Sequence, residues 1–147
     1  MSASRSRDLP GVASDAPLVL FVCAHGAAKS VLAAAEFDRL ANAAGLAFDA
    51  RAAGVEPDAT VAPTVIEFLR SESLQVPQTP RRVTEGDIAR AWRTITFDLE
   101  PTDLPAPPDA NESWDGLPSA GEYPEGFLTE VTPRAAGLVN ELARSHR

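Results

Sequence analysis

The chain has 147 residues, of which 44% are apolar and 23% are charged, and its formal net charge is −8. This size and composition predict one globular domain and exclude a disordered or collagen-like chain. The negative charge argues against nucleic acid as a partner, because binding to a phosphate backbone requires clustered Lys and Arg. The longest apolar run, residues 16–24, is far shorter than the roughly 20 residues of a membrane span. We therefore expect no membrane partner and a cytoplasmic protein.

Residues 1–16 mix Ser, Arg, Asp, Gly and Pro without periodicity, which predicts a flexible leader ahead of a single domain at 17–147. In that domain, β-branched and apolar runs predict strands, and apolar residues at helical spacing predict helices. In chain order, these are a strand at 18–22 that ends at Cys23, a helix from Ser30 to Gly45, a strand at 48–53, a helix at 61–71, a short helix from Thr84 through Trp92, a strand at 94–97 and a helix at 129–144.

The segment from Glu100 to Pro124 contains six prolines and predicts a long surface loop with little regular structure. Strands and helices alternate along the rest of the domain. This order predicts a three-layer α/β fold, a doubly wound, parallel four-stranded sheet with helices on both faces. Ligands of such sheets bind beyond the carboxyl ends of the strands, where Cys23 lies.

Cys23 is the only cysteine. It cannot form an intramolecular disulfide or supply a multi-thiolate metal site, so it is interpreted as a lone thiol and no metal or cofactor is expected. A single cysteine after an apolar strand is often only a small buried hydrophobic side chain, and this alternative stays open for Cys23.

The segment between the first strand and the first helix is Cys23-Ala24-His25-Gly26-Ala27-Ala28-Lys29-Ser30. Its consecutive backbone N–H groups can surround an anion at the helix N-terminus, and the small side chains leave room for it. Gly26 can adopt the positive φ that a tight loop requires. Lys29 adds a positive charge that favours the thiolate, and Ser30 can hydrogen-bond to the sulfur. We predict that residues 24–30 bind phosphate or a similar oxyanion, carried by a protein or a small molecule, and that Cys23 is the nucleophile.

These residues resemble a known signature. Low-molecular-weight protein tyrosine phosphatases, and the thioredoxin-coupled arsenate reductases of the same fold, have a strand followed by Cys, five residues, Arg and Ser. The stretch Leu20-Phe21-Val22-Cys23 with Lys29-Ser30 is similar, and the likeness continues at Arg51-Ala52-Ala53-Gly54, where the family has Ser-Ala-Gly. It covers about residues 18–98. The resemblance implies that Cys23 attacks phosphorus, that the loop amides and Lys29 stabilise the equatorial charge, and that water hydrolyses the cysteinyl phosphate.

The sequence departs from this pattern in three ways. The family arginine is Lys29, a point charge in place of a planar fork that holds two oxygens, so turnover should suffer more than anion binding. The additional cysteines that arsenate reductases of this fold use are absent, which excludes a self-contained reductase cycle. The family's general acid precedes a proline, and no Asp-Pro pair occurs in the chain.

The nearest substitute for that acid is Asp115, in the segment Trp114-Asp115-Gly116-Leu117-Pro118, because a Trp near the acid recurs in the arsenate reductase branch. We predict Asp115 as the proton donor to the leaving group, with Asp103 and Glu122 as alternatives and a plain solvated carboxylate as another. Trp114 is expected to anchor the loop by packing or else to line the site entrance. His25 is interpreted as a loop side chain rather than a base.

Three functions follow from these observations. The first is a phosphatase-like enzyme that hydrolyses a phosphomonoester, phosphotyrosine included, with reduced activity. The second is a catalytically lapsed domain that binds an oxyanion or a phosphorylated partner. The third is an arsenate-handling protein whose second thiol comes from outside the chain.

Overall fold

The computed structural model describes residues 16–77 and 79–146, so the predicted leader lies, apart from residue 16, outside the described residues. The elements are β1 (Leu18–Cys23), α2 (Lys29–Ala43), β2 (Asp49–Gly54), α3 (Pro63–Ser71), α4 (Glu85–Arg90), β3 (Ala91–Thr96), the 3-10 turn η1 (Pro101–Asp103), β4 (Asn111–Ser113) and α5 (Pro124–Ser145). Among the helices of the described ranges, none combines the length and apolar character that crossing a membrane requires.

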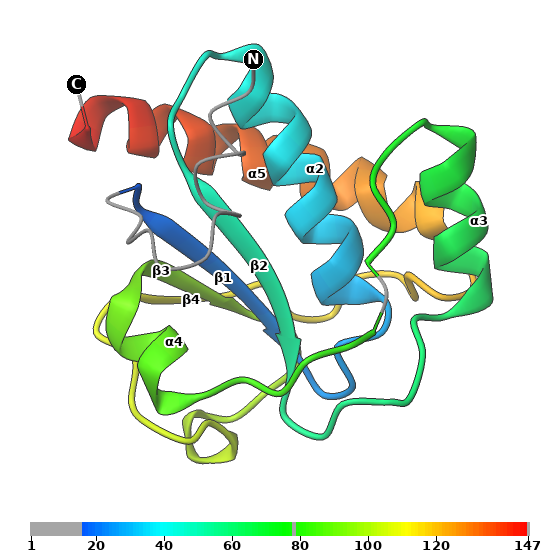
Figure 1. Ribbon diagram of the computed structural model, residues 1–147, viewed down its shortest axis with the longest axis horizontal. Coiled ribbons are helices and arrows are strands. Elements are labelled where there is room, and N and C mark those ends of the chain that lie inside the picture. The colour runs from blue at the N-terminus through cyan, green and yellow to red at the C-terminus, as the bar shows by residue number, and fades with distance from the viewer. Residues whose placement is uncertain (1–15, 78, 147) are drawn as a thin grey trace.

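The four strands form one parallel sheet in the order β2-β1-β3-β4, which confirms the predicted fold (Figure 1). Parallel neighbours bring their carboxyl ends to the same edge. Cys23 pairs with Gly54 at the end of β2, and Val22 pairs with Thr96 at the end of β3. The residues that follow β1, β2 and β3 are therefore neighbours in space.

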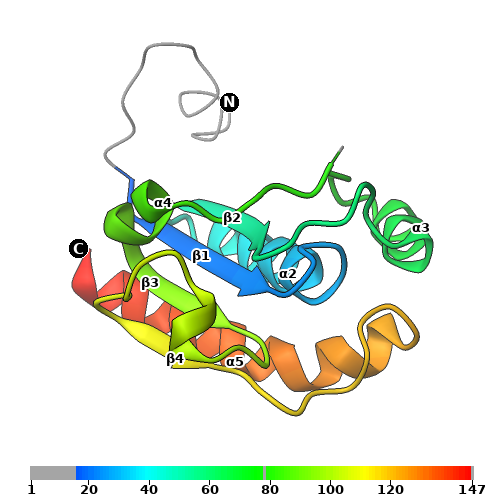
Figure 2. The same ribbon diagram turned by 90° about the horizontal axis from the view of Figure 1, so that it is seen from below.

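Alternate side chains of β1 point to opposite faces of the sheet, as the strand period requires. Val19, Phe21 and Cys23 lie in the larger core cluster, which α2 and α5 cover. Leu20 and Val22 lie in a second cluster under α4 and the segment around η1. Figure 2 shows α2 and α5 on one side of the sheet and α4 on the other. Because β1 is buried on both faces, its sequence is continuously apolar.

The helix ends follow the expected local chemistry. Gly45, just beyond α2, has φ +72°, the left-handed conformation typical of a residue that ends a helix. Pro63 opens α3 at the first helical position, where its missing N–H is harmless. Thr84 caps α4: its side chain accepts from the Asp87 N–H, and the Asp87 side chain accepts from the Thr84 N–H. The predicted positions of these three helices are thus confirmed within a few residues.

The second half of the chain differs from the predictions at two points. The segment 100–123 has little regular structure, as expected, but it contains η1 and the edge strand β4, which was not predicted and in which Asn111 pairs with Thr94 and Ser113 with Thr96. The last helix begins at Pro124 rather than at residue 129. Phe127 explains the earlier start, because it is fully buried and its place in the core requires the first turn of α5. Pro133 consequently lies inside the helix and not near its start.

Candidate functional site

Cys23 ends β1 at the carboxyl edge of the sheet and is 8% exposed. Its Sγ lies 3.2 Å from Ser30 Oγ and accepts the Gly26 N–H at 3.3 Å. Ser30 is completely buried in the first turn of α2, so its hydroxyl is fixed beside the sulfur. The loop therefore curls back over the thiol that precedes it. If the thiol ionises, both Ser30 and Gly26 can donate hydrogen bonds to it.

Several carbonyl groups of this loop accept hydrogen bonds from the segment 55–62. Those of Cys23, Ala24 and His25 accept from the amides of Val55, Glu56 and Asp58, and that of Ala27 accepts from Ala62. In a planar trans peptide, the following N–H points opposite to the carbonyl, so the amides of residues 24, 25, 26 and 28 face away from the 55–62 segment. The Gly26 amide shows where this side is, because it donates to Cys23 Sγ. Backbone donors thus line the side of the loop that faces the sulfur.

Two glycines allow this arrangement. Gly26 has φ +60°, as predicted. Gly54, at the end of β2, supports it from behind, because a Cβ built on Gly54 would lie 2.6 Å from the Gly26 nitrogen. The two backbones are in direct contact, which only glycine permits. The resemblance included Gly54, but the predicted site did not.

The ammonium group of Lys29 does not point freely into solvent. Its Nζ lies 2.8 Å from Asp98 Oδ2, and the two side chains are 24% and 46% exposed. Asp98 follows Phe97, whose N–H donates to the Val22 carbonyl at 3.0 Å, so it lies beside the start of the loop. Sequence reasoning did not include Asp98 in the site. The signal was its position directly after a buried strand, at the edge where ligands of parallel sheets bind.

Asp115 lies next to Asp98 and is hydrogen-bonded to it. Its Oδ1 accepts the Asp98 N–H at 2.7 Å, and the Gly116 N–H donates to Asp98 Oδ1 at 3.0 Å. The ends of β3 and β4 are therefore joined by two hydrogen bonds. The structure brings Asp115 into a chain of contacts that leads through Asp98 to Lys29.

The other predicted acids make local contacts elsewhere. Asp103 accepts the Glu100 N–H in the capping box of η1, and the Glu122 backbone N–H donates to Ser119 Oγ. Neither shows a contact with the loop 24–30 in the part of the chain that is described. Of the three predicted acids, Asp115 is the one that the structure connects to the loop.

Trp114 and His25 have separate roles. Trp114 is 2% exposed, and its ring centroid lies 6.0 Å from that of Phe21 and 5.9 Å from that of Phe97, so it anchors the loop by packing, as expected. His25 Nδ1 lies 3.2 Å from the Glu56 carbonyl oxygen and 3.4 Å from Asp58 Oδ1. The ring is directed to the 55–58 segment and not to the sulfur.

Charge at the site is distributed unevenly. The hydrogen bond from Lys29 and the one from the Gly116 amide hold the pKa of Asp98 below its ordinary value, because both stabilise the carboxylate. Asp98 is therefore ionised at neutral pH. The one lysine of the loop is accompanied by a fixed negative charge.

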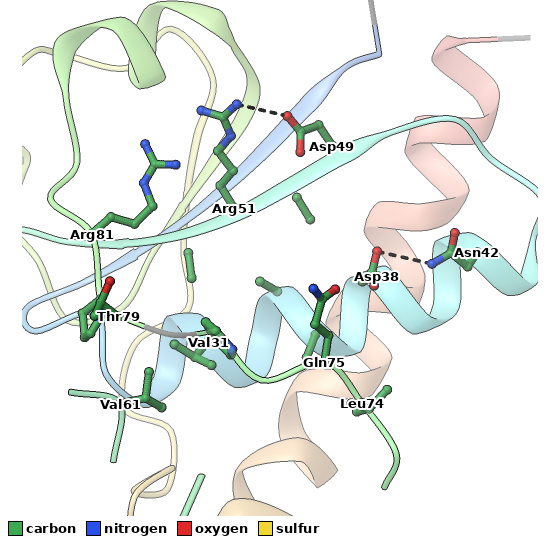
Figure 3. A pocket seen from close by; sticks show the side chains of 17 residues that line it. Val31, Asp38, Asn42, Asp49, Arg51, Val61, Leu74, Gln75, Thr79 and Arg81 are labelled. Atoms are coloured by element: carbon green, nitrogen blue, oxygen red, sulfur yellow. Dashed lines mark hydrogen bonds and ion pairs between the residues drawn. The ribbon is translucent and has the colours of Figure 1, made fainter. Parts of the chain in front are cut away.

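A cavity of about 400 Å³ lies on another side of the loop, between α2, the outer edge of β2 and residues 74, 75, 77 and 79–81 (Figure 3). Arg51 and Arg81 lie at its upper side in Figure 3, with Asp38 and Gln75 on the opposite wall. Gly26 is the one residue of the loop 24–30 among the described residues that line it. The cavity is thus behind the loop and does not contain the thiol.

The comparisons with known proteins agree with this geometry. The family model described as low molecular weight phosphotyrosine protein phosphatase matches residues 18–104. A comparison with curated protein sequences finds no match.

Several solved structures are similar. A thioredoxin-dependent arsenate reductase from Corynebacterium glutamicum is 25% identical with a TM-score of 0.69, and the match covers 90% of this chain and 64% of that one. The chain thus spans less than two thirds of that relative. An arsenate reductase from Archaeoglobus fulgidus is 29% identical with a TM-score of 0.61, covering 83% and 98% of the two chains.

A low molecular weight protein tyrosine phosphatase from Bacillus subtilis is 18% identical with a TM-score of 0.75, covering 88% of this chain and 99% of that one, and it shows the shared fold. The family model covers more than half of the chain, including β1, the loop after Cys23 and the strand that leads to Asp98. The chain belongs to the low molecular weight phosphotyrosine protein phosphatase family.

Proposed function

We propose that the protein hydrolyses a phosphomonoester, with phosphotyrosine as the substrate class that the family description names, through a cysteinyl-phosphate intermediate. The observation that carries the proposal is the position of Cys23 Sγ, 3.2 Å from the buried Ser30 hydroxyl and 3.3 Å from the Gly26 amide. A sulfur held in this way, with backbone donors on the same side, suits a nucleophile that attacks a bound oxyanion.

The reaction proceeds in two displacements. The Cys23 thiolate attacks phosphorus in line, so that an S–P bond forms and the P–O bond to the leaving group breaks. The amides of the loop and the Lys29 ammonium stabilise the charge on the equatorial oxygens. Water then attacks the cysteinyl phosphate and gives its proton to the Asp115 carboxylate, the S–P bond breaks, Cys23 leaves as the thiolate, and inorganic phosphate departs.

Asp115 donates the proton to the leaving oxygen. Asp98 is nearer to Lys29, but its lowered pKa leaves it without a proton at neutral pH. In the described part of the chain, only Oδ1 of Asp115 has a hydrogen-bond partner, the Asp98 N–H. Oδ2 of Asp115 is therefore the oxygen that we place toward the leaving group.

Two features make the turnover lower than that of an enzyme with arginine at this position. Lys29 supplies one charge and no planar fork for two oxygens of the transition state. In addition, its ammonium group is in contact with Asp98 at 2.8 Å. Lys29→Arg is therefore expected to raise kcat for an aryl phosphate, because a bidentate donor is restored.

The deciding experiment is hydrolysis of para-nitrophenyl phosphate under reducing conditions by the wild type, Cys23→Ser, Lys29→Arg and Asp115→Asn. We expect turnover in the wild type, none above background in Cys23→Ser, a higher kcat in Lys29→Arg and a kcat lowered by about 10²-fold in Asp115→Asn. Asp109→Asn is the matched control for Asp115→Asn, because Asp109 is exposed in the same half of the chain. Absence of turnover in both the wild type and Lys29→Arg would refute the phosphatase proposal for this substrate class.

A second function is favoured by Lys29 in place of the family arginine, because its single charge can hold an anion without the planar fork that stabilises a phosphoryl transition state. The protein would then bind phosphate or a phosphorylated protein without hydrolysing it. Calorimetry with inorganic phosphate separates the two functions: binding without hydrolysis by any variant supports the binding domain. Turnover that depends on Cys23 excludes it.

The 25% and 29% identities to arsenate reductases favour a third function in which Cys23 attacks arsenate. Reduction of As(V) to As(III) takes two electrons, which a lone thiol cannot supply. An external thiol, such as glutathione or a thioredoxin-type dithiol, must therefore be oxidised to a disulfide in the cycle. Arsenate-dependent oxidation of added thiol by the wild type, and not by Cys23→Ser, would support this function.

A further inference from the structure

We propose that Asp98 is a built-in competitor of the oxyanion: its carboxylate occupies Lys29 in the unliganded protein and thereby weakens anion binding at the loop. The inference rests on the proposed oxyanion site but goes beyond it, because it assigns a positioning and specificity role to a residue outside the loop. Asp98 lies just beyond the end of β3 and is 69 residues from Lys29 in the sequence.

Asp98 is held in place by three backbone hydrogen bonds. Its Oδ1 accepts the Gly116 N–H, its N–H donates to Asp115 Oδ1, and the preceding Phe97 N–H donates to Val22. Its φ is +55°, in the left-handed region where a non-glycine residue stays only if its surroundings hold it there. The carboxylate therefore does not swing away without breaking these contacts.

The Lys29–Asp98 ion pair forms at a smaller entropic cost than an ordinary surface pair. An isolated pair of exposed side chains contributes little, because ordering both side chains opposes the attraction. Here the carboxylate is already ordered before the pair forms. Only the Lys29 side chain, which is 24% exposed, loses conformational entropy when it contacts Asp98. The pair consequently forms in the resting protein, and an incoming anion must displace or share the Asp98 oxygen.

Asp98 and a bound anion compete for the one positive charge of the loop. When the loop amides hold a phosphate, the phosphate and the Asp98 carboxylate share the single charge of Lys29, so Lys29 attracts the phosphate less strongly than it would without Asp98. The Lys29 ammonium is a compact point charge. As long as it stays in contact with Asp98, its attraction for the bound anion is weakened. Asp98 thus lowers affinity for dianionic phosphate and selects for ligands that tolerate a neighbouring negative charge.

Asp98→Asn tests the idea cleanly. The amide oxygen can still accept the Gly116 N–H, so the contact between the ends of β3 and β4 is preserved and only the charge is lost. Asp109→Asn removes the same charge from an exposed residue that forms no ion pair with Lys29 in the described chain. Thermal unfolding of each variant shows whether the fold is retained.

The measurement is the affinity for inorganic phosphate by calorimetry, at one pH and low ionic strength, in a double-mutant cycle with Lys29→Met. We expect Asp98→Asn to tighten phosphate binding about tenfold in the wild type and less than about threefold in the Lys29→Met background, with Asp109→Asn near the wild type. Correspondingly, Lys29→Met should weaken binding more in Asp98→Asn than in the wild type.

Three outcomes would overturn the inference. These are weaker or unchanged binding in Asp98→Asn, the same change in both backgrounds, and the same change in Asp109→Asn. Absence of phosphate binding in every variant would refute the oxyanion site itself and this inference with it. Tighter binding of phosphate by Asp98→Asn, together with no aryl phosphate hydrolysis by the wild type or Lys29→Arg, would leave the inference standing and refute only the phosphatase proposal.

Discussion

Gly54 is the most informative position for testing how the loop is supported. In Gly54→Ala, the new Cβ would lie 2.6 Å from the Gly26 nitrogen and 2.7 Å from the His25 carbonyl carbon. Both are backbone atoms, and the Gly26 amide is the one that donates to Cys23 Sγ. The loop cannot simply move aside, because the Ala24 and His25 carbonyls are bound to the amides of the next segment.

The size of the effect follows from these distances. Ordinary contact with a Cβ begins at 3.4 Å, so moving the Gly26 nitrogen from 2.6 Å requires a shift of about 0.8 Å. Gly54 itself lacks a positive φ, so the cost is one of packing. Forcing extra volume into a packed site costs about 1–3 kcal/mol of the free energy of unfolding. A misplacement near 1 Å at a reacting centre lowers rates by about 10²-fold.

Urea unfolding measures the first quantity, and phosphate affinity with aryl phosphate turnover measures the second. Gly137→Ala in α5 is the matched control, because nothing lies within 4 Å of the Cβ it adds. Because Gly137 lies inside a helix, Gly137→Ala should raise the free energy of unfolding by about 0.8–1.0 kcal/mol. If Gly54→Ala were as stable as the wild type and bound phosphate equally well, the contact between the two backbones would not support the loop as we describe.

Three further substitutions test the framework around the site. Trp114→Ala should lower the free energy of unfolding by about 3–5 kcal/mol in urea, because the indole is 2% exposed; a loss below 1 kcal/mol would contradict its role as an anchor. Thr84→Ala should lower the free energy of unfolding in urea by about 1 kcal/mol, because the cap on α4 is lost. Thr84→Ser should keep most of this stability, because its hydroxyl can still accept the Asp87 N–H. Burial raises the pKa of Glu36, but hydrogen bonds from Arg39 and Thr132 lower it by more, so the net pKa is below its ordinary value. The carboxylate therefore stabilises the fold above the unfolded pKa, and this contribution is lost as the pH falls through the folded pKa. Glu36→Gln should have a lower free energy of unfolding than the wild type at pH 7, and this difference should shrink as the pH is lowered through the acidic range in which Glu36 becomes protonated.

Local sequence was enough to predict the elements whose side-chain pattern reports burial. The run Leu18–Cys23 is apolar because β1 is covered on both faces, and the cap at Thr84 uses atoms only three residues apart. β4 was missed because its three residues, Asn111–Ser113, are mostly exposed and polar. Such a segment becomes a strand only because the edge of β3 offers it hydrogen bonds.

The sequence alone determined the chemistry of the loop after Cys23. Strand, small residues, Gly26, Lys29 and Ser30 are contiguous, so backbone geometry and side-chain type act within one segment. Tertiary structure alone decided that Asp98 forms an ion pair with Lys29 and that the backbone of Gly54 packs directly against that of Gly26. These contacts join residues that the chain keeps far apart, and they exist because three parallel strands bring their carboxyl ends to one edge.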